Sequence, residues 1–372
     1  MSRFVAILSG GLGERFWPAS TPDRPKQLMP LLGPRTMLRE TVERVSSEYP
    51  PERILIVTSA ALALAVEREC PEIPSENVIG EPSARNTAAA VATAACLALA
   101  RGGAEAALAV LPADHQIRDR AAFLTALGRA FEAAEAEPLI VTLGIRPDRA
   151  ETGYGYITRG EPLGDGVFRI EAFHEKPDPP TAAALVASGR SFWNAGLFIA
   201  RAATLVEEIR RHAPALGQAL NALLGAERSG WEPALREAYE RAPSISFDHA
   251  IMERTRAGAV LPADIGWDDM GSWEAVARFL EPDQAGNVMR GSARVLEARN
   301  NILFADGGRI TLIGADDLVV VRAGSETFVC ARDRLPRMKE LLARLDRSAG
   351  GPAEGTPLEG GGGAGVEGDA HG

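Results

Sequence analysis

Cysteine and long apolar runs are scarce in this chain, and their scarcity excludes several classes of protein. The three cysteines, Cys70, Cys96 and Cys330, have neither metal-ligand nor redox spacing, and no secretion signal precedes them, so we expect buried free thiols in a reducing compartment. The apolar run at residues 4–8 is too short for a signal peptide, and the alanine-rich run at 87–100 is too short to span a membrane. The sequence therefore predicts a cytoplasmic protein that does not bind membranes.

Basic residues are fewer than acidic residues, 40 against 50, and lysine is much rarer than arginine. The formal net charge is −10, which argues against a nucleic-acid partner because nucleic acids are bound by clustered cationic side chains. Only three of the 40 basic residues are lysine, namely Lys26, Lys176 and Lys339. An arginine-rich chain that keeps a lysine uses it where a compact point charge is needed. Small anionic substrates, which require only a local positive pocket, remain open.

Short apolar runs alternate with longer helical stretches through the first half of the 372 residues. The expected strands are 4–8, 54–58, 107–111 and 139–143, and the expected helices are 36–47, 60–69, 87–101 and 121–136. This alternation predicts an α/β fold with a Rossmann-like sheet, mixed but mostly parallel, and helices on both faces. Ligands of such sheets bind beyond the carboxyl ends of the strands.

The pattern changes in the second half of the chain. Strands dominate residues 153–201, and helices resume through Arg254. After Gly286, five short runs begin eight or nine residues apart, at 293–296, 301–304, 309–313, 318–322 and 327–330. They predict a small β-helix-like domain, closed by an apolar helical stripe from Leu335 to Leu345. We expect a catalytic domain at 1–284, the β-domain at 285–347 and a disordered glycine-rich tail at 348–372.

A glycine-rich loop follows the first expected strand. Gly10, Gly11 and Gly13 let backbone N–H groups approach phosphate oxygens, although a plain tight turn is an equal alternative. The loop has neither the Gly-Lys-Ser/Thr of the nucleoside-triphosphatase loop nor the last glycine of the dinucleotide fingerprint. Arg15 adds a phosphate-binding fork, and Lys26 follows among stiffening prolines. Together these residues predict a positively charged pocket suited to binding a triphosphate.

Aspartates lie at two expected strand ends that are far apart in the sequence. Asp114 belongs to Leu-Pro-Ala-Asp-His, and Asp268 and Asp269 follow a tryptophan. A lone strand-end aspartate is usually a cap or turn residue, and His115 by itself is more typical of packing than of ligation. Mg²⁺ takes one or two carboxylates and fills its shell with water and phosphates, which suits this pair better than Zn²⁺ does.

Two further segments carry polar groups near apolar elements. The string from Glu81 to Thr87 precedes an alanine-rich helix, where a helix N-cap and a contact to a nucleotide are equal alternatives. Glu175, Lys176 and Asn194 stand in apolar strands around an expected hairpin. Because an unpaired polar group in such a place is costly, these three side chains need a partner, and a sugar phosphate would serve.

These motifs, in this order, are similar to those of the sugar nucleotidylyltransferase superfamily over roughly residues 4–346. The segment 10–20, followed by Pro-Lys-Gln at 25–27, resembles its signature, and both spellings are those of the mannose-1-phosphate guanylyltransferase branch. The resemblance implies a glycosyltransferase-A-like catalytic domain. It also implies Mg²⁺-dependent transfer of GMP from GTP to mannose 1-phosphate, giving GDP-mannose and pyrophosphate.

The same resemblance assigns roles to individual residues. The catalytic residues are Arg15, Lys26, Asp114 and Asp269, with Mg²⁺ on Asp114 and Asp269, and Asp268 as the alternative to Asp269. The nucleotide contacts are Gly10, Gly11, Gly13, Glu81, Arg85, Asn86 and Thr87. The sugar-phosphate contacts are Gly155, Tyr156, Glu175, Lys176 and Asn194. A Ser-Ile-Asp element is matched only loosely, with Ser246 at the aspartate position and Asp248 two residues later.

Two other functions remain as alternatives. One is a sister transferase that uses glucose 1-phosphate with UTP, dTTP or ATP. The other is a non-catalytic homologue that binds sugar nucleotides, which is disfavoured because this chain keeps Lys26 and the metal aspartates. Some family members add a mannose-6-phosphate isomerase domain, whereas this chain ends in the glycine-rich tail, so we expect no isomerase activity. Exposed strand edges of the β-domain are compatible with a homodimer. The assignment requires Lys26, Asp114, Lys176 and Asp269 to surround one polyanion.

Overall fold

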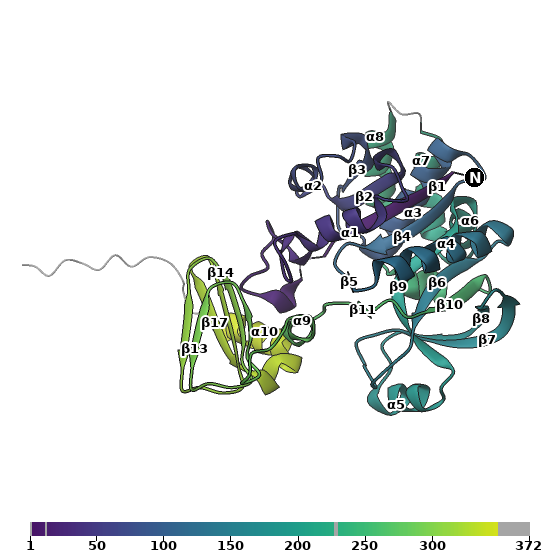
Figure 1. Cartoon of the computed structure of the whole chain (residues 1–372). Helices are drawn as coiled ribbons and strands as arrows, with labels where there is room; N and C mark the ends of the chain where they lie inside the picture. The colour runs from purple at the N-terminus through teal and green to yellow at the C-terminus, as the bar shows by residue number, and fades with distance from the viewer. Residues whose placement is uncertain (1, 12, 227–229, 349–372) are drawn as a thin grey trace, which may run out of the picture.

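The computed structural model describes residues 2–11, 13–226 and 230–348, and these form a large α/β lobe and a smaller β lobe (Figure 1). The tail expected at 348–372 lies outside the described residues, apart from Ser348, which ends the last helix. Within the described residues, no helix is both long enough and apolar enough to cross a membrane.

The α/β lobe alternates strands and helices as the sequence predicts. Its strands are β1 (Arg3–Ser9), β2 (Ile54–Ser59), β3 (Val78–Glu81), β4 (Ala107–Pro112), β5 (Gln116–Ile117), β6 (Ile140–Ile145), β7 (Tyr156–Gly164), β8 (Val167–His174), β9 (Ser191–Arg201), β10 (Gly258–Ala263) and β11 (Trp267–Asp268). Its helices are α1 (Met37–Val45), α2 (Ala63–Glu69), α3 (Asn86–Gly102), α4 (Arg120–Ala136), α5 (Pro179–Ala187), α6 (Ala202–His212), α7 (Pro214–Leu224) and α8 (Trp231–Arg241). Helix α9 (Trp273–Phe279) follows β11 and lies against the β lobe (Figure 1).

The central sheet of the described chain has the strand order β3-β2-β1-β4-β9-β6-β10-β8-β7. The first four strands in that order are mutually parallel, and β6 pairs in parallel with β10. Strand β9 runs antiparallel between β4 and β6, and β7 and β8 form the predicted hairpin at the far edge. The sheet is therefore mixed but mostly parallel, as predicted. Only β3 among its first four strands was not anticipated.

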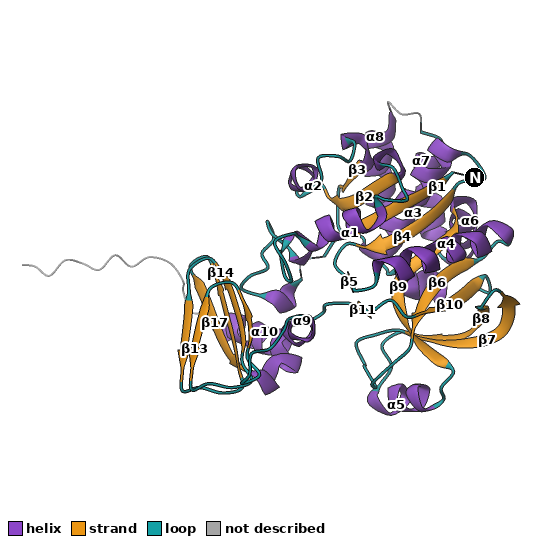
Figure 2. Cartoon of the chain, viewed as in Figure 1, coloured by secondary structure: helices purple, strands orange, loops and turns teal. Residues whose placement is uncertain are grey.

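Two hydrophobic cores lie on opposite faces of the sheet, and Figure 2 shows helices on both sides of it. One core receives α1, α2, α4 and α5, and the other receives α3, α6, α7 and α8. Alanines fill most of the buried face of α3, because small side chains let a helix pack closely on a sheet. Cys70 and Cys96 are buried free thiols as expected, whereas the free thiol of Cys330 is only half-buried.

The β lobe is built from short strands that stack in parallel, except that the last strand runs antiparallel to its neighbour. These are β12 (Val288–Arg290), β13 (Ala293–Leu296), β14 (Ile302–Asp306), β15 (Ile310–Ile313), β16 (Leu318–Ala323) and β17 (Glu326–Ala331), followed by helix α10 (Met338–Ser348). Buried Asn287 and Asn301 form a side-chain ladder at one turn, with Asn301 Nδ2 donating to Asn287 Oδ1 over 2.8 Å. This stacking is the predicted β-helix-like arrangement. In the predicted closing stripe, Leu335 and Met338 are buried but Leu345 is exposed.

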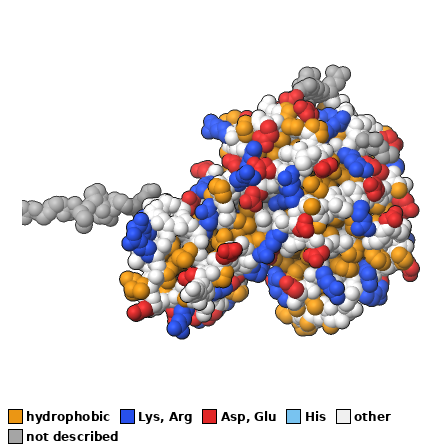
Figure 3. All heavy atoms as spheres, viewed as in Figure 1, with side chains coloured by type: hydrophobic (Ala, Val, Ile, Leu, Met, Phe, Trp, Pro, Cys, Tyr) orange, Lys and Arg blue, Asp and Glu red, His pale blue; other side chains and the backbone are white. Residues whose placement is uncertain are grey.

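The two lobes share a third hydrophobic core. Phe16 packs edge-on against Trp273 with ring centroids 4.9 Å apart, and Trp273 lies 4.9 Å from Phe304 of the β lobe. Trp17 contacts Phe328 of the same lobe with centroids 5.8 Å apart. On the face shown in Figure 3, acidic and basic side chains are interspersed over both lobes rather than segregated. Phe16 and Trp17, which follow the glycine-rich loop in the sequence, thus pack against the second lobe.

Candidate functional site

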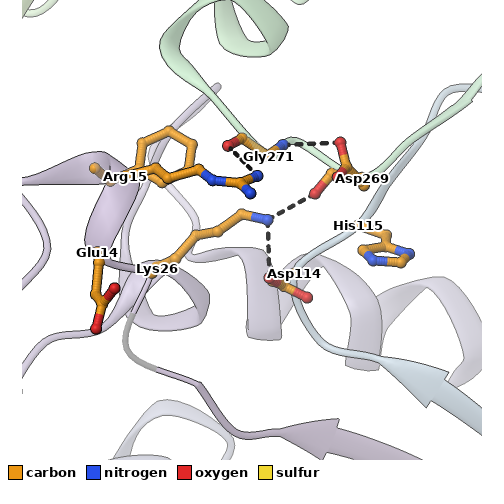
Figure 4. A pocket seen from close by; sticks show the side chains of 9 residues that line it. Glu14, Arg15, Lys26, Asp114, His115, Asp269 and Gly271 are labelled. Carbon is orange, nitrogen blue, oxygen red and sulfur yellow. Dashed lines mark hydrogen bonds and ion pairs between the residues drawn. The ribbon is translucent and has the colours of Figure 1, made fainter. Parts of the chain in front are cut away.

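A pocket of about 450 Å³ opens beyond the carboxyl ends of β1 and β4 (Figure 4). Its lining comes from three distant parts of the chain: Gly13, Glu14, Arg15, Phe16 and Lys26, then Asp114 and His115, then Asp269 and Gly271. All four side chains predicted to be catalytic therefore line one cavity. This position is the one expected for ligands of a parallel sheet.

Lys26 is the buried cation at the centre of this pocket, with only 5% of its surface exposed. Its Nζ donates to Asp114 Oδ2 over 2.8 Å and to the backbone oxygen of Asp269 over 2.7 Å, as Figure 4 shows. Burial by itself would raise the pKa of Asp114, but the Lys26 charge and hydrogen bond hold it below its usual value. Lys26 thus joins the two strand ends that carry the aspartates.

The glycine loop must come very close to Lys26. Gly13 has a φ of +62°, and a Cβ on it would lie 2.6 Å from the Lys26 Cβ, so only glycine fits there. The adjacent Gln27, almost fully buried, donates from Nε2 to the backbone oxygens of Ser9 and Gly11 over 3.1 and 3.3 Å. The Pro-Lys-Gln motif therefore holds the glycine loop as well as supplying the lysine.

The neighbouring aspartates point in different directions. Asp268 is buried, and each of its carboxylate oxygens accepts a hydrogen bond. Its Oδ2 accepts from Arg278 over 2.6 Å, and its Oδ1 accepts from the Met270 N–H over 2.8 Å. Asp269 lines the pocket, with Oδ1 accepting from the Tyr154 hydroxyl over 2.8 Å. A Cβ on Gly271 would lie 2.6 Å from Asp269 Oδ2, so the absent side chain leaves room for this carboxylate.

Two aromatic side chains support the aspartates: His115, which we expected to pack rather than to bind a ligand, and Tyr154, to which the sequence assigned no role. Burial lowers the pKa of His115, and its Nδ1 accepts a hydrogen bond from the Trp267 indole over 3.1 Å. Tyr154 packs edge-on against Trp193 and Trp267, which fixes the hydroxyl that holds Asp269. The available signal was that His115 follows Asp114 directly in the sequence and that Tyr154 lies next to Gly155, a predicted sugar-phosphate contact.

A second group of polar side chains, the amide–carboxylate cluster, consists of Gly155, Glu175, Asn194 and Asp248. Asn194 Nδ2 donates to Asp248 Oδ1 over 2.8 Å, and its Oδ1 accepts from the Thr142 hydroxyl over 3.0 Å. A Cβ on Gly155 would lie 2.6 Å from Glu175 Oε2, so that glycine admits the carboxylate. Burial, together with the Glu175 charge, raises the pKa of Asp248 to about 6.

The cluster lies beside the pocket. Gly196, two residues after Asn194 on β9, would carry a Cβ 3.6 Å from His115 Cε1. Asp248 begins a π-helical turn (Asp248–Met252), a form that often marks functional positions. The sequence matches this element only loosely, with Ser246 at the aspartate position and Asp248 two residues later, and we therefore treated the whole element as secondary. The structure instead puts Asp248 in direct contact with Asn194.

Two residues predicted to bind the sugar phosphate are placed differently from the expectation. Glu175 and Lys176 follow the end of β8 rather than standing inside a strand. The Lys176 ammonium lies 2.6 Å from Glu175 Oε1, its side chain is 60% exposed, and it is not among the residues that line the pocket of Lys26. Tyr156 is fully buried, and its hydroxyl accepts from the Glu151 N–H over 2.9 Å, so its side chain supports the cluster from the core.

The predicted nucleotide residues gather at the ends of β1 and β3. Glu81 Oε1 accepts from the Tyr239 hydroxyl over 2.8 Å, and Arg85 Nε donates to the Tyr239 backbone oxygen over 2.9 Å. Neither Asn86 nor Thr87 is a helix N-cap. Asn86 starts α3 with a φ of +64°, and the Thr87 hydroxyl accepts from the Phe247 N–H over 2.9 Å.

Comparisons with known proteins match both lobes. The nucleotidyl transferase family model matches residues 5–284, and a MannoseP isomerase/GMP-like beta-helix domain model matches residues 291–345. The chain is 40% identical to the xanthan biosynthesis protein XanB of Xanthomonas campestris over 348 residues, covering 92% of this chain and 73% of XanB.

A second relative and a solved structure carry mannose 1-phosphate in their names. A mannose-1-phosphate guanylyltransferase of Sinorhizobium fredii is 36% identical, covering 91% of this chain and 67% of that protein. A crystal structure described as mannose-1-phosphate geranyltransferase from Thermus thermophilus is 37% identical with a TM-score of 0.84, covering 93% of this chain and all of that one.

Proposed function

Because this chain belongs to the nucleotidyl transferase family, with relatives named mannose-1-phosphate guanylyltransferase, we propose that it transfers GMP from GTP to mannose 1-phosphate. The products are GDP-mannose and pyrophosphate. The observation that carries the proposal is the single pocket that holds Arg15, Lys26, Asp114 and Asp269, next to the amide–carboxylate cluster. We place the reaction in the cytoplasm, in keeping with three cysteines that are all free thiols.

The reaction is a displacement at the α-phosphorus of GTP. An oxygen of the sugar phosphate forms the new bond to that phosphorus, and the bond to the β-phosphate bridging oxygen breaks with release of pyrophosphate. The nucleophile is already an anion, so no general base is needed. The bond between the sugar carbon and its oxygen is never broken, and the anomeric configuration is retained. The protein has to position the reactants and offset charge on crowded phosphates.

The pocket residues have the chemistry for this task. Lys26, buried and tied to the aspartates in the free protein, would exchange part of that pairing for phosphate oxygens of the nucleotide. Arg15, whose Nη1 lies 3.5 Å from the Gly271 oxygen at the rim, would contact the departing pyrophosphate. Lys176 would reach the sugar phosphate from the cluster side, leaving Glu175, Asn194 and Asp248 for sugar hydroxyls.

Asp114 and Asp269 fit a Mg²⁺ ion. They offer hard carboxylate oxygens from two strand ends to one cavity, and Gly271 leaves space beside Asp269 Oδ2. No group of three or more His, Cys, Asp and Glu side chains suited to a metal occurs in the described part of the chain, so substrate phosphates and water would complete the shell. When bound, Mg²⁺ would supply positive charge to the reacting phosphates.

The test is a pyrophosphate-release assay over a grid of nucleotides and sugar phosphates. We expect the fastest reaction with GTP and mannose 1-phosphate. A faster reaction with glucose 1-phosphate and UTP, dTTP or ATP would establish the sister transferase instead. A folded protein that releases pyrophosphate with no pair in the grid, in the presence of Mg²⁺, would contradict an enzymatic role.

A further inference from the structure

A positively charged side chain lies buried beside the turn that carries Asp114. Arg44, on α1, is only 7% exposed, and most of the other buried residues of this helix are apolar. In the described part of the chain, no carboxylate forms an ion pair with it. Burial lowers the pKa of its guanidinium to about 10, the Glu40 charge offsets this only in part, and the Arg120 charge adds to it. Because an unpaired buried charge is costly to keep, stability alone does not account for this arginine.

The hydrogen bonds of Arg44 lead to the backbone on both sides of Asp114. Its Nη2 donates to the backbone oxygen of His115 over 3.4 Å, and its Nη1 donates to the Thr41 hydroxyl over 3.2 Å. The Thr41 hydroxyl in turn donates to the backbone oxygen of Ala113 over 3.2 Å. Thr41 and Arg44 are three positions apart and therefore lie on one face of α1. A single helix thus holds both of the carbonyl groups that flank Asp114.

The turn held in this way carries a carboxylate of the pocket. Figure 4 shows the Asp114 side chain directed toward Lys26, to which it is bonded. The same turn is also tied to the central sheet, because the Ala113 N–H donates to the Leu8 backbone oxygen over 3.0 Å. Groups outside a coordination shell commonly orient the ligand atoms, and their loss weakens metal binding. Arg44 occupies the position of such a group.

We propose that Arg44, together with Thr41, is a positioning residue that fixes the turn of Asp114 and so orders its carboxylate for Mg²⁺ before the ion binds. The two side chains act only through the backbone, because neither lines the pocket. A guanidinium suits this task, since its planar fork donates to two acceptors at once. The inference rests on the proposed function, because the Mg²⁺ ion in question is the one that assists GMP transfer.

The first test is Mn²⁺ binding in the presence of GTP and the absence of any sugar phosphate, followed by electron paramagnetic resonance against a blank of GTP alone. Mn²⁺ shares the preference of Mg²⁺ for carboxylate oxygens. Arg44→Met removes the charge and its donors but keeps a long side chain, and it should weaken Mn²⁺ binding about tenfold. The Mg²⁺ concentration for half-maximal pyrophosphate release should rise by the same factor, whereas KM for mannose 1-phosphate should stay within about twofold.

Conservative variants separate positioning from packing. Arg44→Lys keeps the charge but loses the fork, so it should restore Mn²⁺ binding only in part. Thr41→Val keeps the size of the side chain but loses the hydroxyl that reaches Ala113, so it should weaken Mn²⁺ binding in the same direction. Thr41→Ser keeps the hydroxyl and should bind Mn²⁺ as the wild type does.

Arg39→Met is the matched control. Arg39 lies on the same helix, but its guanidinium pairs with Glu43 and Glu72. Its loss should lower the thermal unfolding midpoint slightly and leave Mn²⁺ binding unchanged. Arg44→Met should show the reverse pattern: its midpoint should stay within a few degrees of the wild type, because the desolvation cost of the buried cation disappears together with its hydrogen bonds.

The outcomes separate this inference from the proposed function. Unchanged Mn²⁺ binding in Arg44→Met overturns the inference, and so does a loss of turnover that is equal at all Mg²⁺ concentrations, since either result indicates a purely structural arginine. If Arg44→Met does not fold, the comparison of Thr41→Val with Thr41→Ser decides in the same way. A wild-type protein that binds Mn²⁺ with GTP but transfers no GMP would contradict the proposed function while leaving the role of Arg44 intact.

Discussion

The pocket of Lys26 and the amide–carboxylate cluster are neighbours, yet they are built in different ways. The pocket is lined by three segments that are distant in the sequence. Its buried cation, Lys26, forms an ion pair with Asp114 inside the pocket. The cluster combines Asn194 of β9 with loop and turn residues, and it holds two carboxylates, Glu175 and Asp248, close together with an exposed lysine beside them. The pocket therefore pairs its buried cation with a carboxylate, whereas the cluster holds two neighbouring carboxylates and pairs only one of them with an exposed lysine.

The long-range packing that supports the pocket includes the β lobe. Phe16 lines the pocket and contacts Trp273, which in turn contacts Phe304 of β14. The segment after Lys26 also contacts the β lobe, because Arg290 of that lobe donates to the Pro30 backbone oxygen over 3.3 Å. The β lobe therefore helps to shape the pocket, whereas the residues of the cluster all belong to the α/β lobe.

The largest expected effect comes from breaking the shared core. Phe304→Ala removes a ring that is 3% exposed, and such a truncation costs about 3–5 kcal/mol of unfolding free energy. Because the ring supports Trp273 and Phe16, turnover should also fall under conditions in which the variant is folded. Denaturant unfolding and pyrophosphate release measure the two effects.

Phe131→Ala is the matched control for that experiment. Phe131 is fully buried in a sheet core on α4, so the cost in stability should be similar, but the pocket should be undisturbed. If the two folded variants turn over equally well, the β lobe has no part in shaping the pocket.

The next largest effect is the loss of the buried cation. Lys26→Ala should lower kcat by about 10²-fold or more, the scale of one lost preorganised charge contact, and Asp114→Asn should do likewise. Lys176→Ala is the contrast, since it should mainly raise KM for the sugar phosphate. Steady-state kinetics with each substrate varied in turn distinguishes these patterns, and a wild-type rate in Lys26→Ala would refute its assigned role.

Sequence reasoning worked best where the signal was local. The buried strands β1, β2, β4 and β6 were predicted because each is a continuous apolar run, whereas β3 was missed because only Val78 and Ile79 of its four residues are apolar. The choice of Asp269 over Asp268 agrees with the side chain that faces the pocket. The two aspartate side chains point in different directions because Met270 has a positive φ and because Asp268 forms an ion pair with Arg278. Neither feature can be inferred from the spacing of residues in the sequence.

The rest could not be predicted because it depends on contacts between distant residues. The bond between Lys26 and Asp114 joins residues 88 positions apart, and the Tyr154–Asp269 bond joins residues 115 apart. The contact of Asp248 with Asn194 could not be foreseen either, because it joins residues 54 positions apart. Lys176 was expected at the same polyanion as Lys26, but a positive φ of 47° turns it toward Glu175 and solvent.

A smaller effect should appear in the pH dependence of stability, and it concerns the cluster alone. The pKa of Asp248 is raised from 3.8 to about 6, because the group is buried beside Glu175. An acid with a raised pKa binds more protons when folded, so wild-type stability falls as pH rises from about 4 through about 6. Asp248→Asn should escape this loss and be about 3 kcal/mol more stable than the wild type at pH 8, with no such advantage at pH 4. Urea unfolding at both pH values tests it, and an advantage that is equal at the two would refute the assignment.

The smallest expected effect tests whether the cluster and the pocket bind different substrates. Asn194→Ala removes the amide that bonds Asp248 and Thr142, and we expect about a tenfold rise in KM for the sugar phosphate, as for one lost polar contact. The KM for GTP should stay within about twofold, because Asn194 does not line the pocket of Lys26. Thr142→Val is the control, since it removes only the buried partner of Asn194. If Asn194→Ala weakened both substrates equally, the pocket and the cluster would act as one site and the contrast between them would fail.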